Sequence, residues 1–258
     1  MSTILFNDII FGPIKSRRLG TSLGVNLLPK FGKWCSFDCL YCECGFNKDG
    51  KGDNKLPTLE QVKESLETRL KDYTTNVGRI DTITFSGNGE PTMHPDFAEI
   101  IDFTLEIRDR YAPKAKISVL SNASQIHKSK VLAALLKVDN PILKIDSAFE
   151  KTTKLIDRPQ YEYSLENLIV YLVPLKNNFV LQTMFLKGEF DGNVVDNTTK
   201  EEVEAWRELV EAIEPREIMI YTIDRETPAA NLQKVSVAEM EKIAAPLIKK
   251  GYNIKISG

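Results

Sequence analysis

The feature that most constrains the fold of this chain is the regular alternation of short β-rich runs with helical periods along its 258 residues. The predicted strands span residues 22–27, 81–86, 116–121, 142–147, 180–186, 217–222 and 252–256. Amphipathic stretches lie between them; the first places Leu59, Val62, Leu66 and Leu70 on one face at helical spacing. Strands that are separated by helices predict parallel pairing through crossover helices.

Capping boxes mark three predicted helix starts, at residues 58–61, 199–202 and 236–239. No linker rich in Pro, Gly or Ser interrupts the series, so the sequence predicts a single domain over residues 1–258. The longest segments without periodicity are residues 1–21, 29–57 and 187–198. Long loops in compact domains are usually functional, so these segments are candidates for a site.

One face of most predicted strands is polar, whereas a fully buried parallel strand is expected to be apolar on both faces. The polar faces carry Ser22, Gly24 and Asn26; Thr82, Thr84 and Ser86; Lys116, Ser118 and Asn122; Lys144 and Asp146; and Gln182. The opposite faces are apolar and are expected to pack on helices. This pattern favours a barrel, complete or partial, whose interior holds a polar ligand. An open doubly wound sheet with chance alternation is the alternative.

The composition excludes several classes of protein. A hydrophobic content of 42% and a net charge of −2 exclude intrinsic disorder. The bulk positive charge of a typical nucleic-acid binder is missing. No basic region precedes an apolar run at the start of the chain, and no apolar stretch approaches the ~20 residues of a membrane span. The sequence therefore predicts a soluble cytoplasmic protein, with reduced thiols and no membrane association.

All four cysteines of the chain fall within ten residues. Cys35, Cys39 and Cys42 form a C-x3-C-x2-C pattern after the first predicted strand, in the loop where parallel α/β barrels place their chemistry. A structural zinc site usually brings two separated pairs, and no second pair exists here. A 4Fe–4S cluster normally takes four cysteines, so three ligands would leave one iron open. Cys44 is one residue beyond Cys42, and an unligated thiol is the favoured interpretation of it; its role stays open.

This motif, with an aromatic residue before the third cysteine, resembles that of the radical S-adenosylmethionine (SAM) superfamily. The run Gly87-Asn88-Gly89-Glu90, after the second predicted strand, resembles the glycine-glycine-glutamate motif of that superfamily, with Asn88 in place of the first glycine. The resemblance covers residues 13–225 and implies an α/β fold, a partial (β/α)6 barrel. It makes residues 29–57 the cluster-binding loop and residues 1–21 an N-terminal extension.

The resemblance also implies a cofactor set. Cys35, Cys39 and Cys42 would hold a 4Fe–4S cluster, and the amino and carboxylate groups of SAM would chelate its open iron. An electron donor such as flavodoxin or ferredoxin would reduce the cluster. Reductive cleavage of SAM would then yield a 5′-deoxyadenosyl radical that abstracts hydrogen from an unidentified substrate. The cofactors carry this chemistry, while the protein binds, orients and excludes water.

Several residues are predicted to contact SAM on the same grounds. Glycines allow close backbone approach, and Glu90 or the carbonyls beside it would accept hydrogen bonds from the SAM ammonium. Lys144 suits the SAM carboxylate, and Asp146, on the same strand face, suits a ribose hydroxyl or the ammonium. The further candidates are Tyr41, Gly87, Asn88, Gly89, Ser121, Asn122 and Gln182. Each candidate has a structural alternative. These are a βα turn for residues 87–90, a buried Lys–Asp pair for Lys144 and Asp146, strand-end capping for Ser121 and Asn122, and a core amide for Gln182.

A closer resemblance is to the wyosine-synthase-like branch, whose characterised members modify a guanosine in tRNA. Residues 16–24, Asp157-Arg158-Pro159 and residues 221–225 carry it, and the Asp–Arg pairs are plausible substrate contacts. Extra cysteines for the second cluster of that branch are absent from the 34 residues before Cys35, and a net charge of −2 gives no Lys and Arg excess for phosphates. The substrate is therefore left open among a small molecule, a protein and tRNA. A structural zinc protein or an electron-transfer Fe–S protein is the non-enzymatic alternative.

Overall fold

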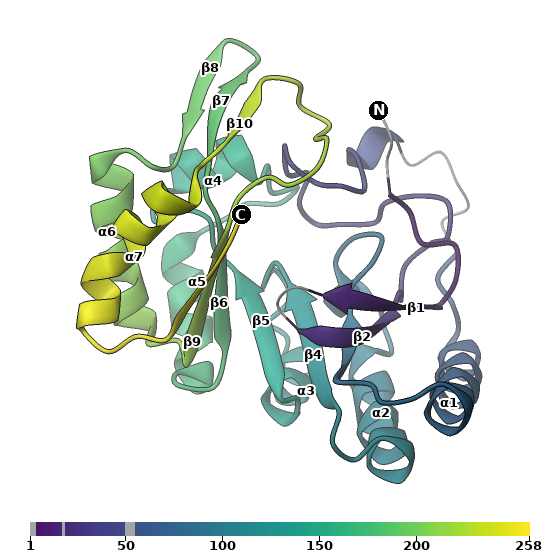
Figure 1. The fold of residues 1–258 in the computed structure, drawn as a ribbon. Helices are drawn as coiled ribbons and strands as arrows, with labels where there is room; N and C mark the ends of the chain where they lie inside the picture. Colours follow the sequence, from purple (N-terminus) through teal and green to yellow (C-terminus); the bar gives the residue numbers. More distant parts are fainter. Residues whose placement is uncertain (1–3, 17–18, 50–54) are drawn as a thin grey trace. The chain divides into compact units, whose positions relative to one another are not determined.

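A computed structural model of the chain describes all residues except 1–3, 17–18 and 50–54. The described residues form two compact units (Figure 1). We call residues 5–35 and 47–141 the N-terminal unit, and residues 36–46 and 142–258, together with Ile4, the C-terminal unit. The prediction of a single domain stays a prediction.

The N-terminal unit is a sheet with helices on it. The strand order is β1-β2-β3-β4, in which β1 runs antiparallel to β2 and the other pairs are parallel. The strands are β1 (Ile10–Ser16), β2 (Gly20–Val25), β3 (Thr82–Phe85) and β4 (Lys116–Ser121). The helices are α1 (Leu59–Asn76), α2 (Phe97–Tyr111) and α3 (Ser129–Lys137), with 3-10 turns at Asn47–Asp49 and Pro91–Met93.

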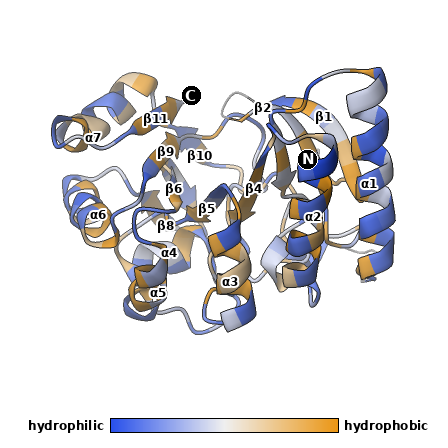
Figure 2. Cartoon of the chain, turned by 90° about the horizontal axis from the view of Figure 1, so that it is seen from below, coloured by the Kyte–Doolittle hydropathy of each residue, from blue (hydrophilic) through white to orange (hydrophobic). Residues whose placement is uncertain are grey.

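The two faces of this sheet differ as the alternation predicts. Apolar strand residues such as Leu23, Ile83 and Ile117 are fully buried, and burial of each such side chain stabilises the fold by about 1.5–3 kcal/mol. Figure 2 shows both the hydrophobic and the hydrophilic colour along α1 and α2. On the polar face, hydroxyl groups bond from strand to strand: Ser22 to Thr84 at 2.7 Å and Thr82 to Ser118 at 3.0 Å. These four hydroxyl residues are buried, and their side chains satisfy one another.

The C-terminal unit has two sheets. Its larger sheet is parallel, with the order β5-β6-β9-β11, and its smaller sheet is antiparallel, with the order β10-β7-β8. The strands are β5 (Asn140–Lys144), β6 (Val180–Met184), β7 (Leu186–Phe190), β8 (Asn193–Asp196), β9 (Glu217–Tyr221), β10 (Leu232–Lys234) and β11 (Ile254–Ser257). The helices are α4 (Glu150–Ile156), α5 (Leu165–Leu172), α6 (Lys200–Ile213) and α7 (Val237–Lys249), with a 3-10 turn at Val173–Leu175. Figure 1 shows the β7–β8 hairpin extending beyond the end of β6.

The predicted α/β class with mostly parallel strands is confirmed, and the open sheets are consistent with a partial barrel. All seven predicted strands are present, with ends shifted by at most three residues. Two of the segments without periodicity contain strands that the sequence did not predict: residues 1–21 include β1, and residues 187–198 include most of the β7–β8 hairpin. A register shift between Phe11 and Ile14 breaks the alternation of β1. The hairpin turns at Asp191-Gly192, both with positive φ, and Asp-Gly is a strong hairpin signal that the sequence did carry.

Two of the three predicted capping boxes are confirmed in full, at Thr58 and at Ser236. In the third predicted capping box, one of the two hydrogen bonds is present and the other is not. Thr199 caps α6 by accepting from the Glu202 backbone N–H, but the Glu202 carboxylate accepts hydrogen bonds from Ser147 and Thr152 instead of returning to the cap. Glu202 is only 8% exposed, and a buried carboxylate needs hydrogen-bond donors, which the two hydroxyl groups supply. No helix in the described part of the chain has the length and apolar character of a membrane span.

Candidate functional site

The cysteine motif is divided between the two units. Cys35 belongs to the N-terminal unit, whereas Cys39, Cys42 and Cys44 lie in residues 36–46 of the C-terminal unit, which we call the cysteine loop. Turn hydrogen bonds shape this loop: the Cys42 N–H donates to the Cys39 carbonyl at 3.2 Å, and the Gly45 N–H donates to the Cys42 carbonyl at 2.9 Å. None of the four cysteines forms a disulfide. Cys39 is buried and the other three are half-buried.

Cys35 is held between the glycine loop and the end of β4. The Trp34 N–H donates to the Asn88 carbonyl at 2.8 Å, and the Glu90 N–H donates to the Trp34 carbonyl at 3.1 Å. From β4, Asn122 Nδ2 donates to Cys35 Sγ at 3.5 Å. The structure therefore brings Cys35 together with Asn88, Glu90 and Asn122, four of the residues predicted for the site.

Glycine is required in the Gly87–Glu90 loop. Gly87 and Gly89 have φ values of +128° and +137°, which only glycine adopts readily. A Cβ atom on Gly89 would lie 1.9 Å from the Trp34 carbonyl oxygen, and one on Gly87 would lie 2.5 Å from Asn26 Oδ1. Both glycines therefore serve close packing of the loop on the residues that precede Cys35.

Asn88, the residue that departs from the superfamily motif, is fully buried. Its Oδ1 accepts from the Phe6 N–H at 2.8 Å, and its Nδ2 donates to the Phe6 carbonyl at 2.9 Å and to the Pro29 carbonyl at 2.7 Å. Its backbone N–H donates to Asn26 Oδ1 at 3.1 Å. Asn88 thus joins the N-terminal segment and the residues after β2 to the glycine loop. Asn26 is a site-supporting residue that the sequence pattern did not single out beyond its strand face.

Glu90 ties the glycine loop to the end of β4. Its Oε1 accepts from the Thr92 N–H at 3.1 Å, from the Thr92 hydroxyl and from the Ser121 hydroxyl at 2.8 Å, and its Oε2 accepts from the Asn122 N–H at 2.7 Å. Burial raises the pKa of Glu90, and these hydrogen bonds act in the opposite direction. The predicted trio of Glu90, Ser121 and Asn122 is therefore one buried network, and Thr92 is a member that the sequence did not point to.

A charged cluster lies in the C-terminal unit. The Lys144 Nζ atom is 2.8 Å from Asp146 Oδ2 and also donates to Asp157 Oδ1, and the Tyr41 hydroxyl donates to Asp146 and, at 3.2 Å, to Asp157. Burial works against the lysine charge, but the two carboxylates outweigh it and raise the pKa of Lys144 well above its usual value. Burial and the neighbouring Asp146 raise the pKa of Asp157 to about 7. Gln182 pairs with Lys144 in the β5–β6 register.

Asp157 is the member of this cluster that the sequence placed elsewhere, among plausible substrate contacts. It is the C-cap residue of α4, so no strand periodicity connects it with Lys144. Its Oδ2 atom is buried and has no hydrogen-bond partner among the described residues. Burial and the two carboxylates also raise the pKa of Tyr41 well above its usual value, so this phenol stays a proton donor.

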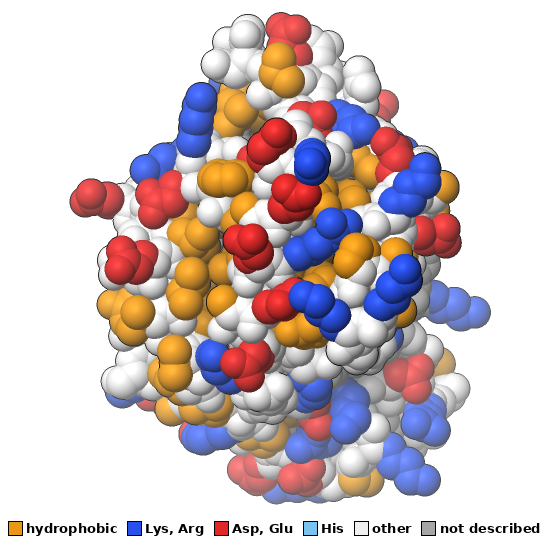
Figure 3. Space-filling view, turned by 90° about the vertical axis from the view of Figure 1, so that its left-hand side faces the viewer, with side chains coloured by type: hydrophobic (Ala, Val, Ile, Leu, Met, Phe, Trp, Pro, Cys, Tyr) orange, Lys and Arg blue, Asp and Glu red, His pale blue; other side chains and the backbone are white. Residues whose placement is uncertain are grey.

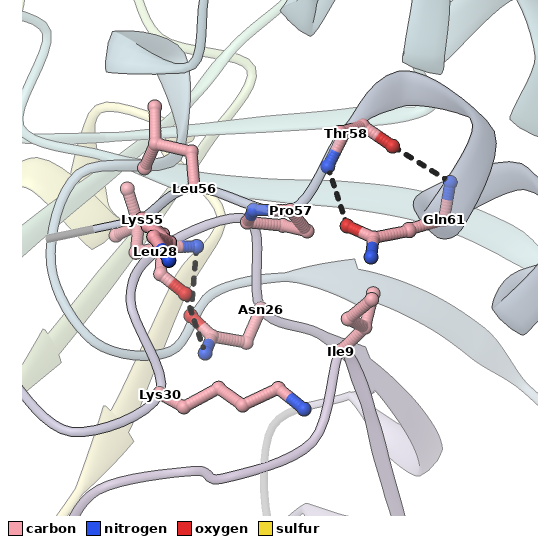
Figure 4. A pocket seen from close by; sticks show the side chains of 9 residues that line it. All are labelled: Ile9, Asn26, Leu28, Lys30, Lys55, Leu56, Pro57, Thr58 and Gln61. Carbon is pink, nitrogen blue, oxygen red and sulfur yellow. Dashed lines mark hydrogen bonds between the residues drawn. The ribbon is translucent and has the colours of Figure 1, made fainter. Parts of the chain in front are cut away.

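The N-terminal unit also contains a cavity of about 480 Å³ (Figure 4). Its lining residues are Ile9, Asn26, Leu28, Lys30, Lys55, Leu56, Pro57, Thr58 and Gln61. Figure 4 shows the mutual hydrogen bonds of Thr58 and Gln61 at one wall, where α1 begins. None of the predicted site residues lines this cavity.

Residues 30–198 match the model of the Radical SAM superfamily. The chain belongs to this superfamily. It is 31% identical over 237 residues to a "GTPase Obg" of Brachyspira hyodysenteriae, covering 90% of this chain and 32% of that protein. It is 29% identical over 243 residues to the UPF0026 protein MJ1312 of Methanocaldococcus jannaschii, covering 92% of this chain and 70% of that protein. The chain thus spans about a third of the length of the first of these relatives.

Solved structures share the fold. A radical SAM methyltransferase from Sphaerobacter thermophilus superposes with a TM-score of 0.68 over 92% of this chain and 65% of that one, at 13% identity. An archaeal TYW1 gives a TM-score of 0.51 over 88% of this chain and 71% of that one, at 15% identity. At these identities the likeness concerns the fold, and it agrees with the predicted radical SAM type.

Enzymes of this superfamily use a 4Fe–4S cluster and SAM. Among the residues that the structure describes, no three His, Cys, Asp or Glu side chains are grouped as ligands of a single metal ion. The chemistry of the donor set nevertheless fits an iron–sulfur cluster. The thiols are not consumed in disulfides, and Cys35 Sγ already accepts an N–H···S hydrogen bond, a contact that tunes cluster sulfurs.

Proposed function

We propose that this chain is an enzyme that binds a 4Fe–4S cluster through Cys35, Cys39 and Cys42 and uses SAM as its second cofactor. When bound, these groups supply the reductive cleavage of SAM to a 5′-deoxyadenosyl radical, which abstracts hydrogen from the substrate. The observation that carries the proposal is the N-terminal network in which Asn122 connects Glu90 with Cys35. The superfamily match over residues 30–198 supports it.

In the N-terminal unit, the residues of this network bind and orient SAM. The carbonyl groups of Gly87, Asn88 and Gly89 and the less occupied Oε2 atom of Glu90 are proposed to accept from the ammonium. Four hydrogen bonds donated to the Glu90 carboxyl group fix its direction, so it presents a fixed acceptor. Ser121 and Asn122 are proposed to line the same subsite, because both are bonded to Glu90.

The buried charged cluster of the C-terminal unit carries the remaining residues proposed for SAM. We assign Lys144 to the SAM carboxylate and Asp146 to a ribose hydroxyl or the ammonium, with Tyr41 and Gln182 beside them. The Asp146 carboxylate is fully buried, and its hydrogen bond from the Met184 N–H at 2.9 Å fixes its direction. The Asp146 and Asp157 carboxylates suit the hydroxyl or ammonium group assigned to Asp146, whereas Lys144 supplies the positive charge for the SAM carboxylate.

Anaerobic reconstitution with iron and sulfide, followed by dithionite and SAM, tests the proposal. The expected products are 5′-deoxyadenosine and methionine, and the reduced protein is expected to give the EPR signal of a 4Fe–4S cluster. Alanine at Cys35, Cys39 or Cys42 is expected to abolish both, whereas Cys44→Ser, the matched control, retains them. Loss of the cluster in Cys44→Ser, with tolerance at the other three positions, would contradict the three-ligand assignment.

The substrate and the electron donor are proposed only as classes. A flavodoxin or ferredoxin is the expected reductant, and a cytoplasmic location is expected. On the face shown in Figure 3, Lys and Arg side chains are interspersed with Asp and Glu, which gives no continuous basic surface there for phosphates. The net charge of −2 also gives no excess of Lys and Arg, so a small molecule or a protein is preferred to tRNA as the substrate. Binding to tRNA at increasing salt separates the cases, since phosphate recognition weakens steeply with salt.

A further inference from the structure

A short segment of the C-terminal unit runs antiparallel to the cysteine loop. The Asp38 N–H donates to the Asp157 carbonyl at 3.0 Å, and the Leu40 N–H donates to the Ile156 carbonyl at 2.9 Å. In return, the Gln160 N–H donates to the Ser36 carbonyl at 2.8 Å, and Phe37 and Pro159 form an isolated antiparallel bridge. The Asp157-Arg158-Pro159 motif therefore shapes the backbone that leads into Cys39.

Arg158, at the centre of this segment, contacts the cysteine loop on both sides of its cysteines. Its guanidinium NH1 lies 3.6 Å from Asp38 Oδ2, one residue before Cys39. The same guanidinium carbon lies 5.1 Å from the centre of the Phe46 ring, at the other end of the loop, and 5.3 Å from that of Phe190 at the end of β7. The two rings are 6.3 Å apart, so the cation faces both of them.

We propose that Arg158 is a positioning residue, a clasp that holds the cysteine loop in the shape in which Cys39 and Cys42 bind the cluster. The inference rests on the proposed function. Every contact of the clasp is made by protein groups, so the clasp acts on the loop whether or not metal is present. It assigns a role to a motif that the sequence had related only to substrate.

The chemistry of the side chain suits this task. A guanidinium is planar, stacks on aromatic faces and donates in its plane, so one group can engage Asp38 and the two rings at once. A lysine at this position would keep the positive charge, but its ammonium group is not planar and cannot stack on the two rings in the same way. Arg158 also has a φ of +49°, a conformation that favours glycine, so its side chain is retained against a backbone preference.

That φ value permits a clean test, because Arg158→Gly removes the clasp while relieving the backbone. In protein without cluster, under reduction, the rate of Cys39 and Cys42 alkylation is measured by peptide mass spectrometry. Each cation–π contact contributes about 0.5–1 kcal/mol at a part-exposed site, which predicts alkylation roughly 5- to 30-fold faster in Arg158→Gly. Arg158→Lys is expected to fall between this variant and the parent, since it retains the pairing with Asp38.

The matched control is Arg225→Ala. Arg225 pairs with Glu43 of the same loop, but both side chains are largely exposed, and such pairs contribute little. Its alkylation rates are expected to stay within about twofold of the parent. The second readout is loss of visible absorption to an iron chelator after reconstitution, expected to be faster in Arg158→Gly and unchanged in Arg225→Ala. Thermal unfolding by circular dichroism checks that Arg158→Gly folds and unfolds cooperatively.

The two proposals fail in different ways. If Arg158→Gly shows the parent's alkylation rates and chelator resistance, the clasp is refuted while the cluster assignment stands. If the parent chain loads no cluster, the proposed function fails, and the alkylation rates still decide whether Arg158 holds the loop. If alkylation of Cys39 and Cys42 were equally faster in Arg225→Ala, the clasp would also be refuted, because loss of any charged partner of the loop would then expose these cysteines.

Discussion

Gly89→Ala is the substitution for which the structure gives the largest and most local effect. The new methyl carbon would lie 1.9 Å from the Trp34 carbonyl oxygen, a distance that backbone atoms cannot tolerate. The φ of +137° adds a conformational cost of about 1–3 kcal/mol for any other residue. Relief of the overlap must move the chain at Trp34 and break its two hydrogen bonds to Asn88 and Glu90, each contributing about 0.5–1.5 kcal/mol.

These contributions sum to about 2–6 kcal/mol of lost unfolding free energy, measured by urea denaturation followed by circular dichroism. Gly78→Ala is the matched control. Gly78 has a φ of +151°, but nothing lies within 4 Å of its added Cβ. It therefore carries the conformational cost alone, about 1–3 kcal/mol.

The difference between the two losses of unfolding free energy measures the cost of disturbing the close contact between the glycine loop and Trp34. Because Trp34 adjoins Cys35, Gly89→Ala is also expected to lower the iron content after reconstitution, whereas Gly78→Ala leaves it unchanged. Equal losses of stability in the two variants, together with equal iron content, would refute the reasoning.

Two further substitutions test the polar groups of the site. Asn88→Asp keeps the shape of Asn88 but places a charged acceptor against the Phe6 and Pro29 carbonyls. A loss of about 2–4 kcal/mol of unfolding free energy is therefore expected in urea denaturation. A loss below about 1 kcal/mol would contradict the hydrogen-bond assignment. Asp157 has a pKa raised to about 7, so the folded state binds its proton more tightly than the unfolded state does, and stability falls as pH rises from Asp's usual pKa towards about 7. Asp157→Asn is expected to remove this slope, measured by urea denaturation from pH 5 to 8; an unchanged slope would assign the titration to another group.

The fold was largely predictable because its signals are local. Alternation at strand period and capping residues depend on neighbours a few positions away, and they located all seven predicted strands. Where a strand lacked a long alternating run, as in β1 and β10, prediction failed. The Asp191-Gly192 turn of the β7–β8 hairpin was a readable signal, although the strands on either side of it are only five and four residues long.

The site was predictable only in part, and the missing part has a physical cause. The two-residue spacing of Lys144 and Asp146 places them on one strand face, and the structure pairs them. Asp157 joins them from the end of α4, a tertiary contact without a sequence period. Glu202 is a second example. Its spacing from Thr199 predicts a capping box, but in the folded chain its carboxylate accepts hydrogen bonds from Ser147 and Thr152, which are distant in sequence.

The two units hold their parts of the cysteine motif by different physical means. In the N-terminal unit, backbone contact at Gly89 and the amide of Asn88 fix the residues around Cys35, and both depend on shape and neutral hydrogen bonds. In the C-terminal unit, a backbone ladder and a guanidinium between two rings fix the loop that carries Cys39 and Cys42. A cluster bound at these cysteines would need ligands held in place by surrounding packing, since a loosely supported site loses affinity and geometry. Asn88 and Arg158 provide such support from outside the proposed ligand set, Asn88 through its hydrogen bonds to Phe6 and Pro29 and Arg158 through Asp38 and the two rings.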